Sequence, residues 1–444
     1  MWKIYRQVTR KLYHTCGYVK YHVTLSYTQY DSMYMYSTTY MMNEVFHQVG
    51  YIINAYLPTQ YEILHPSHVL NVTTPDVMDL HFLPTYKYVK KLILPHFRGN
   101  LEQLIPCTQL EYLRMSSFQG DIYPLVECRN LHTLKSDWPL LDISPLIHYY
   151  SLRVVNLTLI HGMKDPLQYC IHLEAITIHS FNGSIASLAK CSNLQKLNLP
   201  EFNGDISPLS NCRNLRSIRL NKFTGTDIQP LSICTDLEEL YMMRFTGSTL
   251  PLYKCKQLQV IHMPMCRFDR STFECINLKS IQVREFQCQL FHLQHLQTIE
   301  IRDFDGALRP FRECKNLRKL LLPSCKARLR YDDPKSLHML SNCKDLECIS
   351  MGSIVDYVTP FSVYTLSSCQ SIKWIYLGVS DNPCITVQLY LQLFKHIEIA
   401  IVKSLNGSHI LYDLSDGQIS HESCLEEWIY INLEDELLFR SLYD

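Results

Sequence analysis

A short hydrophobic motif recurs about every 21 residues through the middle of the chain. Its core reads Leu-x-x-Leu-x-Leu, as at Leu194, Leu197 and Leu199. The Leu-x-Leu alternation predicts a β-strand with one buried face. Because one unit cannot bury its leucines alone, the repeat predicts a stack of coils that share a continuous core.

Other residue types keep the same register as the leucines. A cysteine precedes the strand, with Tyr149 in one such slot, and a Pro-Leu or Pro-Phe pair ends many units. The cysteines are Cys107, Cys128, Cys170, Cys191, Cys212, Cys234, Cys255, Cys275, Cys314, Cys343 and Cys369. A phenylalanine follows the strand at residues 97, 118, 181, 202, 223, 245, 286 and 304, with a glycine two residues later in most units. We expect each glycine to turn the chain by taking a positive φ.

The rest of each unit is too short for a long helix. About ten residues return the chain to the next strand, which favours a 3-10 turn or an extended segment. The pattern therefore predicts an α/β repeat solenoid, a horseshoe with a parallel sheet on its concave face and short 3-10 or extended convex segments. Residues 86–402 hold about 14 such units, of which the late ones are irregular.

The two ends of the chain differ from the repeats. Residues 1–43 are rich in tyrosine, and we expect a poorly ordered leader. Residues 44–85 include EVFHQVGYIINAYL, whose apolar residues have helical spacing up to Pro58. They predict a small helical segment that caps the first repeat. Residues 403–444 are acidic and also apolar, which predicts a C-terminal cap over the last repeat, with a mobile peptide motif as the alternative.

The Leu-x-x-Leu-x-Leu pattern resembles the leucine-rich-repeat family, and the cysteine before each strand is similar to its cysteine-containing subclass. A short helical segment ahead of such repeats also resembles the F-box-plus-repeat proteins of giant DNA viruses and slime moulds. That resemblance implies docking of a Skp-type adaptor and a cullin, with the chain as substrate receptor of a ubiquitin ligase. The adaptor-binding residues would be Ile52, Ile53, Tyr56, Leu57 and Pro58.

Composition and charge narrow the classes of function. Apolar residues make up 47% and charged residues 19% of the 444, which argues against long disorder. The net charge is zero, so an overall basic nucleic-acid binder is disfavoured. Residues 403–444 carry −7 and residues 86–402 carry +7. No apolar run reaches the roughly 18 residues of a membrane span, and no secretory signal is readable. We therefore expect a cytoplasmic protein, in the host cytoplasm if it is viral, with its cysteines as free thiols.

Motifs for catalysis or cofactor binding are missing from the sequence. It has no Cys-x-x-Cys, phosphate-binding loop, Gly-x-Ser-x-Gly or His-Glu-x-x-His. We predict no catalytic residue, metal site or cofactor, and the register of the cysteines favours a packing role. A cryptic enzyme site in the irregular units between Cys314 and Cys369 is a third hypothesis.

The polar positions of the repeated strands define a candidate binding face. Reading them in register places arginine, aromatic and methionine side chains together, which is typical of protein interfaces. Basic residues there would suit an acidic protein, and the aromatic residues are too sparse for a nucleic-acid stacking platform. The alternative is an ordinary solvated strand face. The candidate partner-binding residues are Arg219, Tyr241, Met243, His262, Arg284 and Arg302.

Overall fold

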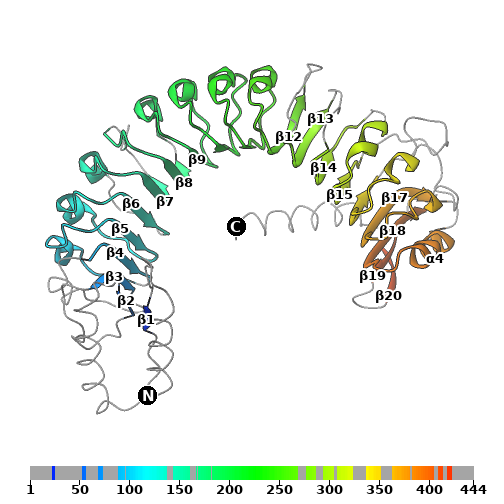
Figure 1. The fold of residues 1–444 in the computed structure, drawn as a ribbon, viewed down its shortest axis with the longest axis horizontal. Helices are drawn as coiled ribbons and strands as arrows, with labels where there is room; N and C mark the ends of the chain where they lie inside the picture. The colour runs from blue at the N-terminus through cyan, green and yellow to red at the C-terminus, as the bar shows by residue number, and fades with distance from the viewer. Residues whose placement is uncertain are drawn as a thin grey trace, which may run out of the picture. The chain divides into compact units, whose positions relative to one another are not determined.

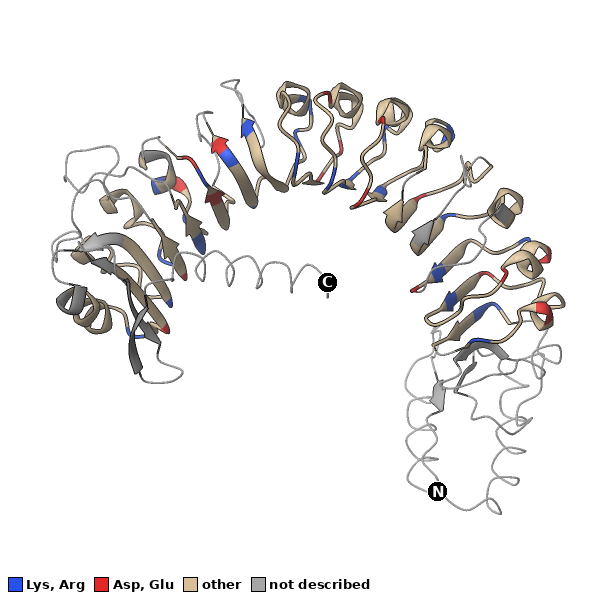
Figure 2. Cartoon of the chain, turned by 180° about the vertical axis from the view of Figure 1, so that it is seen from behind, with Lys and Arg blue, Asp and Glu red and all other residues tan. Residues whose placement is uncertain are grey.

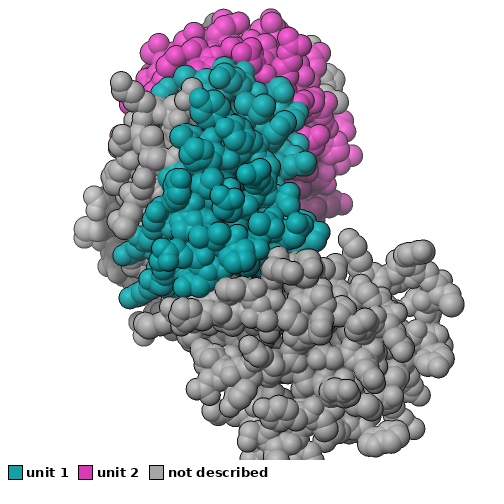
Figure 3. Space-filling model, turned by 90° about the vertical axis from the view of Figure 1, so that its left-hand side faces the viewer, with its two compact units in different colours: residues 1–199 teal, residues 200–444 magenta. Residues whose placement is uncertain are grey.

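The chain folds into two compact units, residues 1–199 and residues 200–444 (Figure 3). The structure is a computed structural model. It describes residues 23–25, 53–56, 69–73, 89–95, 97–137, 144–160, 167, 169–181, 183–268, 277–286, 294–304, 308–323, 337–351, 363–380, 383–404, 409–413 and 418–422.

The first unit contains nine described strands. In chain order they are β1 (Val23–Leu25), β2 (Ile53–Tyr56), β3 (Val69–Thr73), β4 (Lys91–Leu94), β5 (Tyr112–Met115), β6 (Thr133–Ser136), β7 (Val154–Ile160), β8 (Ala175–Phe181) and β9 (Lys196–Asn198). Each strand pairs in parallel with the next one along the chain. The 3-10 helices are η3 (Glu102–Leu104), η4 (Tyr123–Glu127), η5 (Ser144–His148) and η6 (Ala186–Lys190).

The second unit continues the same construction. Its strands are β10 (Ser217–Arg219), β11 (Glu239–Tyr241), β12 (Val260–Phe268), β13 (Ser280–Phe286), β14 (Thr298–Ile301), β15 (Lys319–Leu321), β16 (Cys348–Ser350), β17 (Trp374–Ser380), β18 (Ile399–Ser404), β19 (His409–Asp413) and β20 (Gln418–Glu422). Pairing is parallel through β18, and β19 and β20 are added in antiparallel fashion. The helices are η7 (Ser207–Asn211), η8 (Gln229–Ile233), η9 (Leu250–Lys254), η10 (Arg309–Glu313), η11 (Leu337–Leu340) and α4 (Pro383–Leu393).

Strands and short helices lie on opposite sides of each unit (Figure 1). We call the side of the strands that points away from the leucine core the sheet face. The opposite side, formed by the short helices, is the turn face. The repeated leucines fill the layer between them, and Leu194, Leu197 and Leu199 are at most 1% exposed. The prediction of 3-10 return segments is confirmed, except that α4 is an 11-residue α-helix.

The sequence explains how each 3-10 helix begins and ends. Proline occupies one of the first two positions in η4, η7, η8, η9 and η10, where its missing N–H costs no hydrogen bond. In η7, the Asp205 carboxylate accepts the backbone N–H of Ser207 at 2.8 Å. At the other end, the Cys212 N–H donates to the Leu209 carbonyl at 2.9 Å.

The cysteine ladder both packs in the core and binds one coil to the next. The Sγ atoms of Cys128, Cys255 and Cys369 donate to carbonyls of the preceding coil at 3.7, 3.6 and 3.4 Å. Tyr149 takes the same slot, and its hydroxyl donates to the buried Ile122 carbonyl at 2.7 Å. Burial raises the pKa of Cys128 to about 12, so the thiol stays protonated at neutral pH.

The role predicted for glycine is wrong at Gly120, Gly204, Gly225 and Gly247. None of the four has φ in the left-handed region. A Cβ atom on Gly120 would instead lie 2.6 Å from Cζ of Phe118, and one on Gly204 2.7 Å from Cζ of Phe202. Glycine is needed at the first three positions because the phenylalanine ring two residues earlier folds over it. At Gly247 an added Cβ would meet the Thr226 carbonyl oxygen as well as the Phe245 ring. These rings stack between coils, with centroids 6.0 Å apart for Phe97 and Phe118.

The helical prediction for the N-terminal segment fails over residues 53–56. They form β2, which pairs in parallel with β1 and β3. The alternation of INAY satisfies a strand as well as the helical period, and sheet pairing provides the hydrogen bonds. The rest of the predicted helix, Ile52, Leu57 and Pro58 included, lies outside the described residues. So do the leader apart from β1 and residues 423–444 of the predicted cap.

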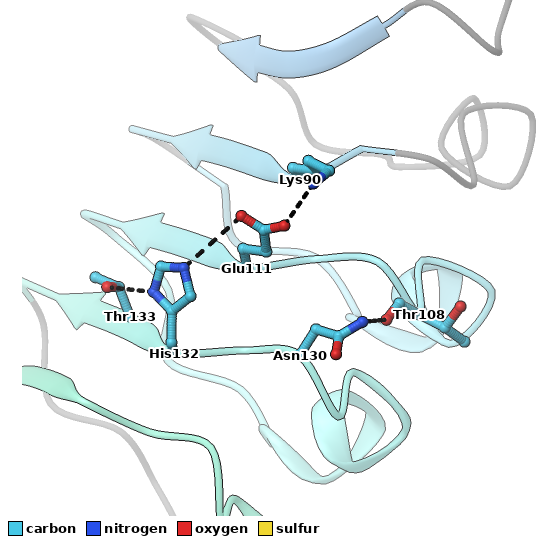
Figure 4. A network of polar contacts seen from close by, with 6 residues as sticks. All are labelled: Lys90, Thr108, Glu111, Asn130, His132 and Thr133. Atoms are coloured by element: carbon cyan, nitrogen blue, oxygen red, sulfur yellow. Dashed lines mark hydrogen bonds and ion pairs between the residues drawn. The ribbon is translucent and has the colours of Figure 1, made fainter. Parts of the chain in front are cut away.

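Ion pairs join successive coils at the edge of the sheet where the strands begin. In the first unit, the Glu111 carboxylate lies 2.7 Å from Nζ of Lys90 and 3.8 Å from Nε2 of His132 (Figure 4). On the turn side of the same coils, Nδ2 of Asn130 donates to the Thr108 carbonyl at 3.2 Å. Lys90 and Glu111 are partly exposed, so their ion pair adds on the order of 0.5 kcal/mol at most to stability.

Candidate protein-interaction face

Three of the predicted site residues lie side by side on the sheet face of the second unit. Register pairs Arg219 of β10 with Tyr241 of β11, and Tyr241 with His262 of β12. The Arg219 guanidinium carbon is 4.3 Å from the centroid of the Tyr241 ring, a cation–π contact. The Tyr241 and His262 rings follow with centroids 5.7 Å apart and planes inclined by 35°. We call these three residues the stacked triad.

The environment of the triad determines its charge. Burial, helped by Arg219 and Arg302, lowers the pKa of His262 to about 4, so the imidazole is neutral at pH 7. Burial and the Glu239 carboxylate raise the pKa of Tyr241, against the opposing effect of Arg219. At neutral pH the triad therefore presents one permanent cation and two neutral polar rings.

The remaining predicted residues lie around the triad with different surroundings. Met243, two residues beyond Tyr241, is half-buried. Arg302 follows β14 and is close enough to depress the pKa of His262. Arg284 of β13 is exposed, and its Nε lies 2.9 Å from Oδ2 of Asp303. The structure thus joins Arg302 to the triad electrostatically and pairs Arg284 with a carboxylate.

Sequence reasoning missed three polar contacts on this face. Glu239 accepts the Ser217 hydroxyl at 2.9 Å, and the Gln282 amide donates to Glu300 at 2.9 Å. The third contact is the ion pair of Arg284 with Asp303 described above. The strand register could have placed Ser217 beside Glu239 and Gln282 beside Glu300. The Arg284 pair joins offset positions, which the strand register does not place opposite each other.

Ion pairs also join oppositely charged residues on the strands of the second unit, or directly before them. Arg216 pairs with Glu238 at 3.3 Å, and Arg267 pairs with Glu285 at 3.3 Å. Basic and acidic residues consequently lie on neighbouring strands (Figure 2). The described part of the face is mixed in sign and has no continuous basic stripe of the kind that binds a nucleic-acid backbone.

Within the described ranges, other kinds of site have no support. No group of three or more His, Cys, Asp or Glu side chains there is placed to hold a metal ion. No helix among those residues has the length and apolarity to cross a membrane. Residues 324–336 and 352–362, where a cryptic enzyme site was hypothesised, lie outside the described residues. Of the adaptor-binding candidates, Ile53 and Tyr56 lie in β2.

Comparison with solved structures identifies the fold. The plant peptide hormone receptor RGFR1, in complex with RGF2, has a TM-score of 0.52 and 14% identity over 74% of this chain and 65% of its own. A leucine-rich-repeat protein of Leptospira interrogans has a TM-score of 0.52 and 10% identity over 70% and 84%. TLR13, in complex with ssRNA13, has a TM-score of 0.51 and 12% identity over 78% and 56%. No protein-family profile and no curated protein matches the sequence.

The fold is therefore a leucine-rich-repeat solenoid, as the leucine period predicts. At 10–14% identity these likenesses establish the architecture alone. The function has to be argued from the side chains on the surface of the chain.

Proposed function

We propose that the protein is a non-enzymatic scaffold that binds a protein partner on the sheet face of its second unit. The observation that carries the proposal is the stacked triad of Arg219, Tyr241 and His262. The stack on Tyr241 orients the guanidinium before a partner arrives, which reduces the entropy lost on binding. Arginine and tyrosine are also the side chains that most often dominate binding energy.

The chemistry of the triad favours an acidic partner segment with apolar side chains. A carboxylate would accept hydrogen bonds from Arg219, while apolar groups would cover the Tyr241 ring and Met243. Nucleic acid suits the face less well because ion pairs interrupt its positive charge. The structural neighbour RGFR1 is a plant peptide hormone receptor in complex with RGF2, and a peptide-like ligand for this chain is compatible with that likeness.

The proposal is tested by capture of partners from a eukaryotic lysate on the full-length chain. Wild type is compared with the variant Arg219→Ala/Tyr241→Ala/Arg284→Ala and with Tyr253→Ala. Tyr253 lies in η9 on the turn face and is 48% exposed, which makes it a matched control. We expect proteins retained by wild type and Tyr253→Ala to be lost from the triple variant. Equal retention of these proteins by all three would show that the partner does not bind at this face.

A role as ubiquitin-ligase receptor rests on the sequence resemblance alone, and the strand at Ile53–Tyr56 does not favour it. The same capture experiment decides it. Recovery of a Skp-type adaptor and cullin by wild type, and their loss from Tyr56→Ala/Leu57→Ala, would establish the receptor. If wild type captures no adaptor, the ligase role is excluded, and the N-terminal strands only extend the repeat sheet.

A further inference from the structure

The sheet face of the second unit changes character at β15. Up to β14, the central position of each strand is polar or aromatic, ending with Gln282 and Glu300. Register then continues this column from Glu300 to Leu321, Ser350, Tyr376 and Ile401. Trp374 and Ile399 are paired in the neighbouring column. We call Leu321, Trp374, Tyr376, Ile399 and Ile401 the apolar end.

Four of the five side chains of the apolar end are buried although they lie on the sheet face, and the fifth, Trp374, is partly buried. Leu321, Ile401, Tyr376 and Ile399 are 4%, 5%, 9% and 9% exposed, whereas Arg219, Tyr241 and His262 are each half-buried. Tyr376, Ile399 and Ile401 form one hydrophobic cluster with Trp374 packed against it. The inward residues Ala400 and Val402 fill the leucine core on the opposite side of the strand. Burial of both sides of β18 is the pattern of a strand that is covered on both faces.

The chain itself carries a segment of matching composition. Residues 423–444 follow β20 and place Leu425, Ile429, Leu433 and Leu437 at four-residue intervals, with Trp428 beside them. This spacing is typical of an amphipathic segment with one apolar side. The same 22 residues contain six acidic residues and Arg440 alone as a base.

Length and charge both suit contact with the apolar end. Four strand spacings separate β20 from β16, or about 19 Å at ~4.8 Å per strand. Even as a helix, with a rise of ~1.5 Å per residue, 22 residues would span about 33 Å. Arg302 and Lys319 lie on the β14–β15 side of the apolar end, where they would face the acidic side chains of the segment.

We propose that residues 423–444 dock in cis on the apolar end, with their leucines and Trp428 over Tyr376, Ile399 and Ile401. The docked segment would cover β15–β18 and confine partner binding to β10–β14. This inference goes beyond the proposed function, because it rests on the apolar end and not on the stacked triad.

The test is photo-cross-linking within the full-length chain. Benzoylphenylalanine replaces Trp374 in one protein and Tyr253 on the turn face in a control protein. We expect position 374 to give adducts with peptides from residues 423–444 at a monomeric mass, at least tenfold above position 253. Trp428→Ser should reduce this adduct at least tenfold, whereas Ile431→Ser, on the opposite side of a helix from the stripe, should leave it unchanged.

Three results would overturn the proposal. They are adducts at position 374 with other segments only, adducts only at dimeric mass, and equal yields for Trp428→Ser and Ile431→Ser. Dimeric adducts would instead assign the apolar end to the tail of a second copy. Arg219→Ala should leave the adduct unchanged, so failure of the docking proposal and failure of the partner-binding proposal are separate outcomes.

Discussion

Replacing Gly120 by alanine should destabilise its coil because the new methyl group would overlap the Phe118 ring. The added Cβ would lie 2.6 and 2.8 Å from two ring carbons, whereas carbon atoms pack at about 3.5–4 Å. Phe118 is fully buried and stacks on Phe97 with planes 8° apart, so the ring has little room to move. Overpacking of this kind costs about 1–3 kcal/mol. Restriction of the unfolded chain by alanine returns about 0.4–1 kcal/mol.

A double-mutant cycle separates this explanation from a backbone requirement for glycine. In a Phe118→Leu background the ring is gone, so Gly120→Ala should become neutral or slightly stabilising, with a coupling energy of about 1–3 kcal/mol. Hydrogen exchange of the β5 amides gives the local opening free energy, which suits a repeat protein better than a global transition. An equal cost of Gly120→Ala in both backgrounds would refute the reasoning.

Three further predictions follow from the cores of the coils and the triad. Tyr149→Phe removes the 2.7 Å hydrogen bond to the Ile122 carbonyl, which still accepts the Leu125 N–H at 3.0 Å. The substitution should therefore cost about 0.5–1.5 kcal/mol, measured by hydrogen exchange of β7. Burial raises the pKa of Cys234 to about 12, so site-resolved alkylation at pH 8 should modify the half-buried Cys348 well before it; equal rates would contradict the placement. The folded pKa of His262, about 4, lies below its usual 6.5, so protonation favours the unfolded state. The free energy of unfolding is then unaffected by His262 above pH 6.5 and falls by up to about 3 kcal/mol between pH 6.5 and 4. Urea titrations should show this loss in wild type, and His262→Gln should lack it.

The periodic part of the fold could be predicted because one physical constraint repeats in every coil. Leu194, Leu197 and Leu199 are buried as their spacing requires, and a short 3-10 helix, η6, fills the return segment before this strand. The role of Gly120 could not be predicted, because a glycine that makes room for a ring and a glycine with positive φ look the same in sequence. Phe268 lies outside the phenylalanine positions that the repeat predicts, yet its ring centroid is 5.6 Å from that of Phe286. An irregularity between Met263 and Arg267 brings Phe268 into register with Phe286.

The position of the candidate face could be predicted from the sequence, but its ion pairs and pKa shifts could not. Counting along the strands places Arg219, Tyr241 and His262 in one column, as the register has them. Counting gives no account of side-chain direction, so the pairing of Arg284 with Asp303 required the structure. The depressed pKa of His262 also depends on burial and on Arg302, which lies two strands away.

The most direct test of the proposed binding face is the affinity of a purified partner from the capture experiment for three full-length proteins. They are wild type, Arg219→Ala and the turn-face control Tyr253→Ala, each titrated calorimetrically at low and high salt. Loss of a central arginine costs about 2 kcal/mol or more, so Arg219→Ala should raise Kd about 30-fold and weaken the salt dependence, with Tyr253→Ala unchanged. An unchanged Kd for Arg219→Ala, or an equal loss for Tyr253→Ala, would contradict binding at the stacked triad.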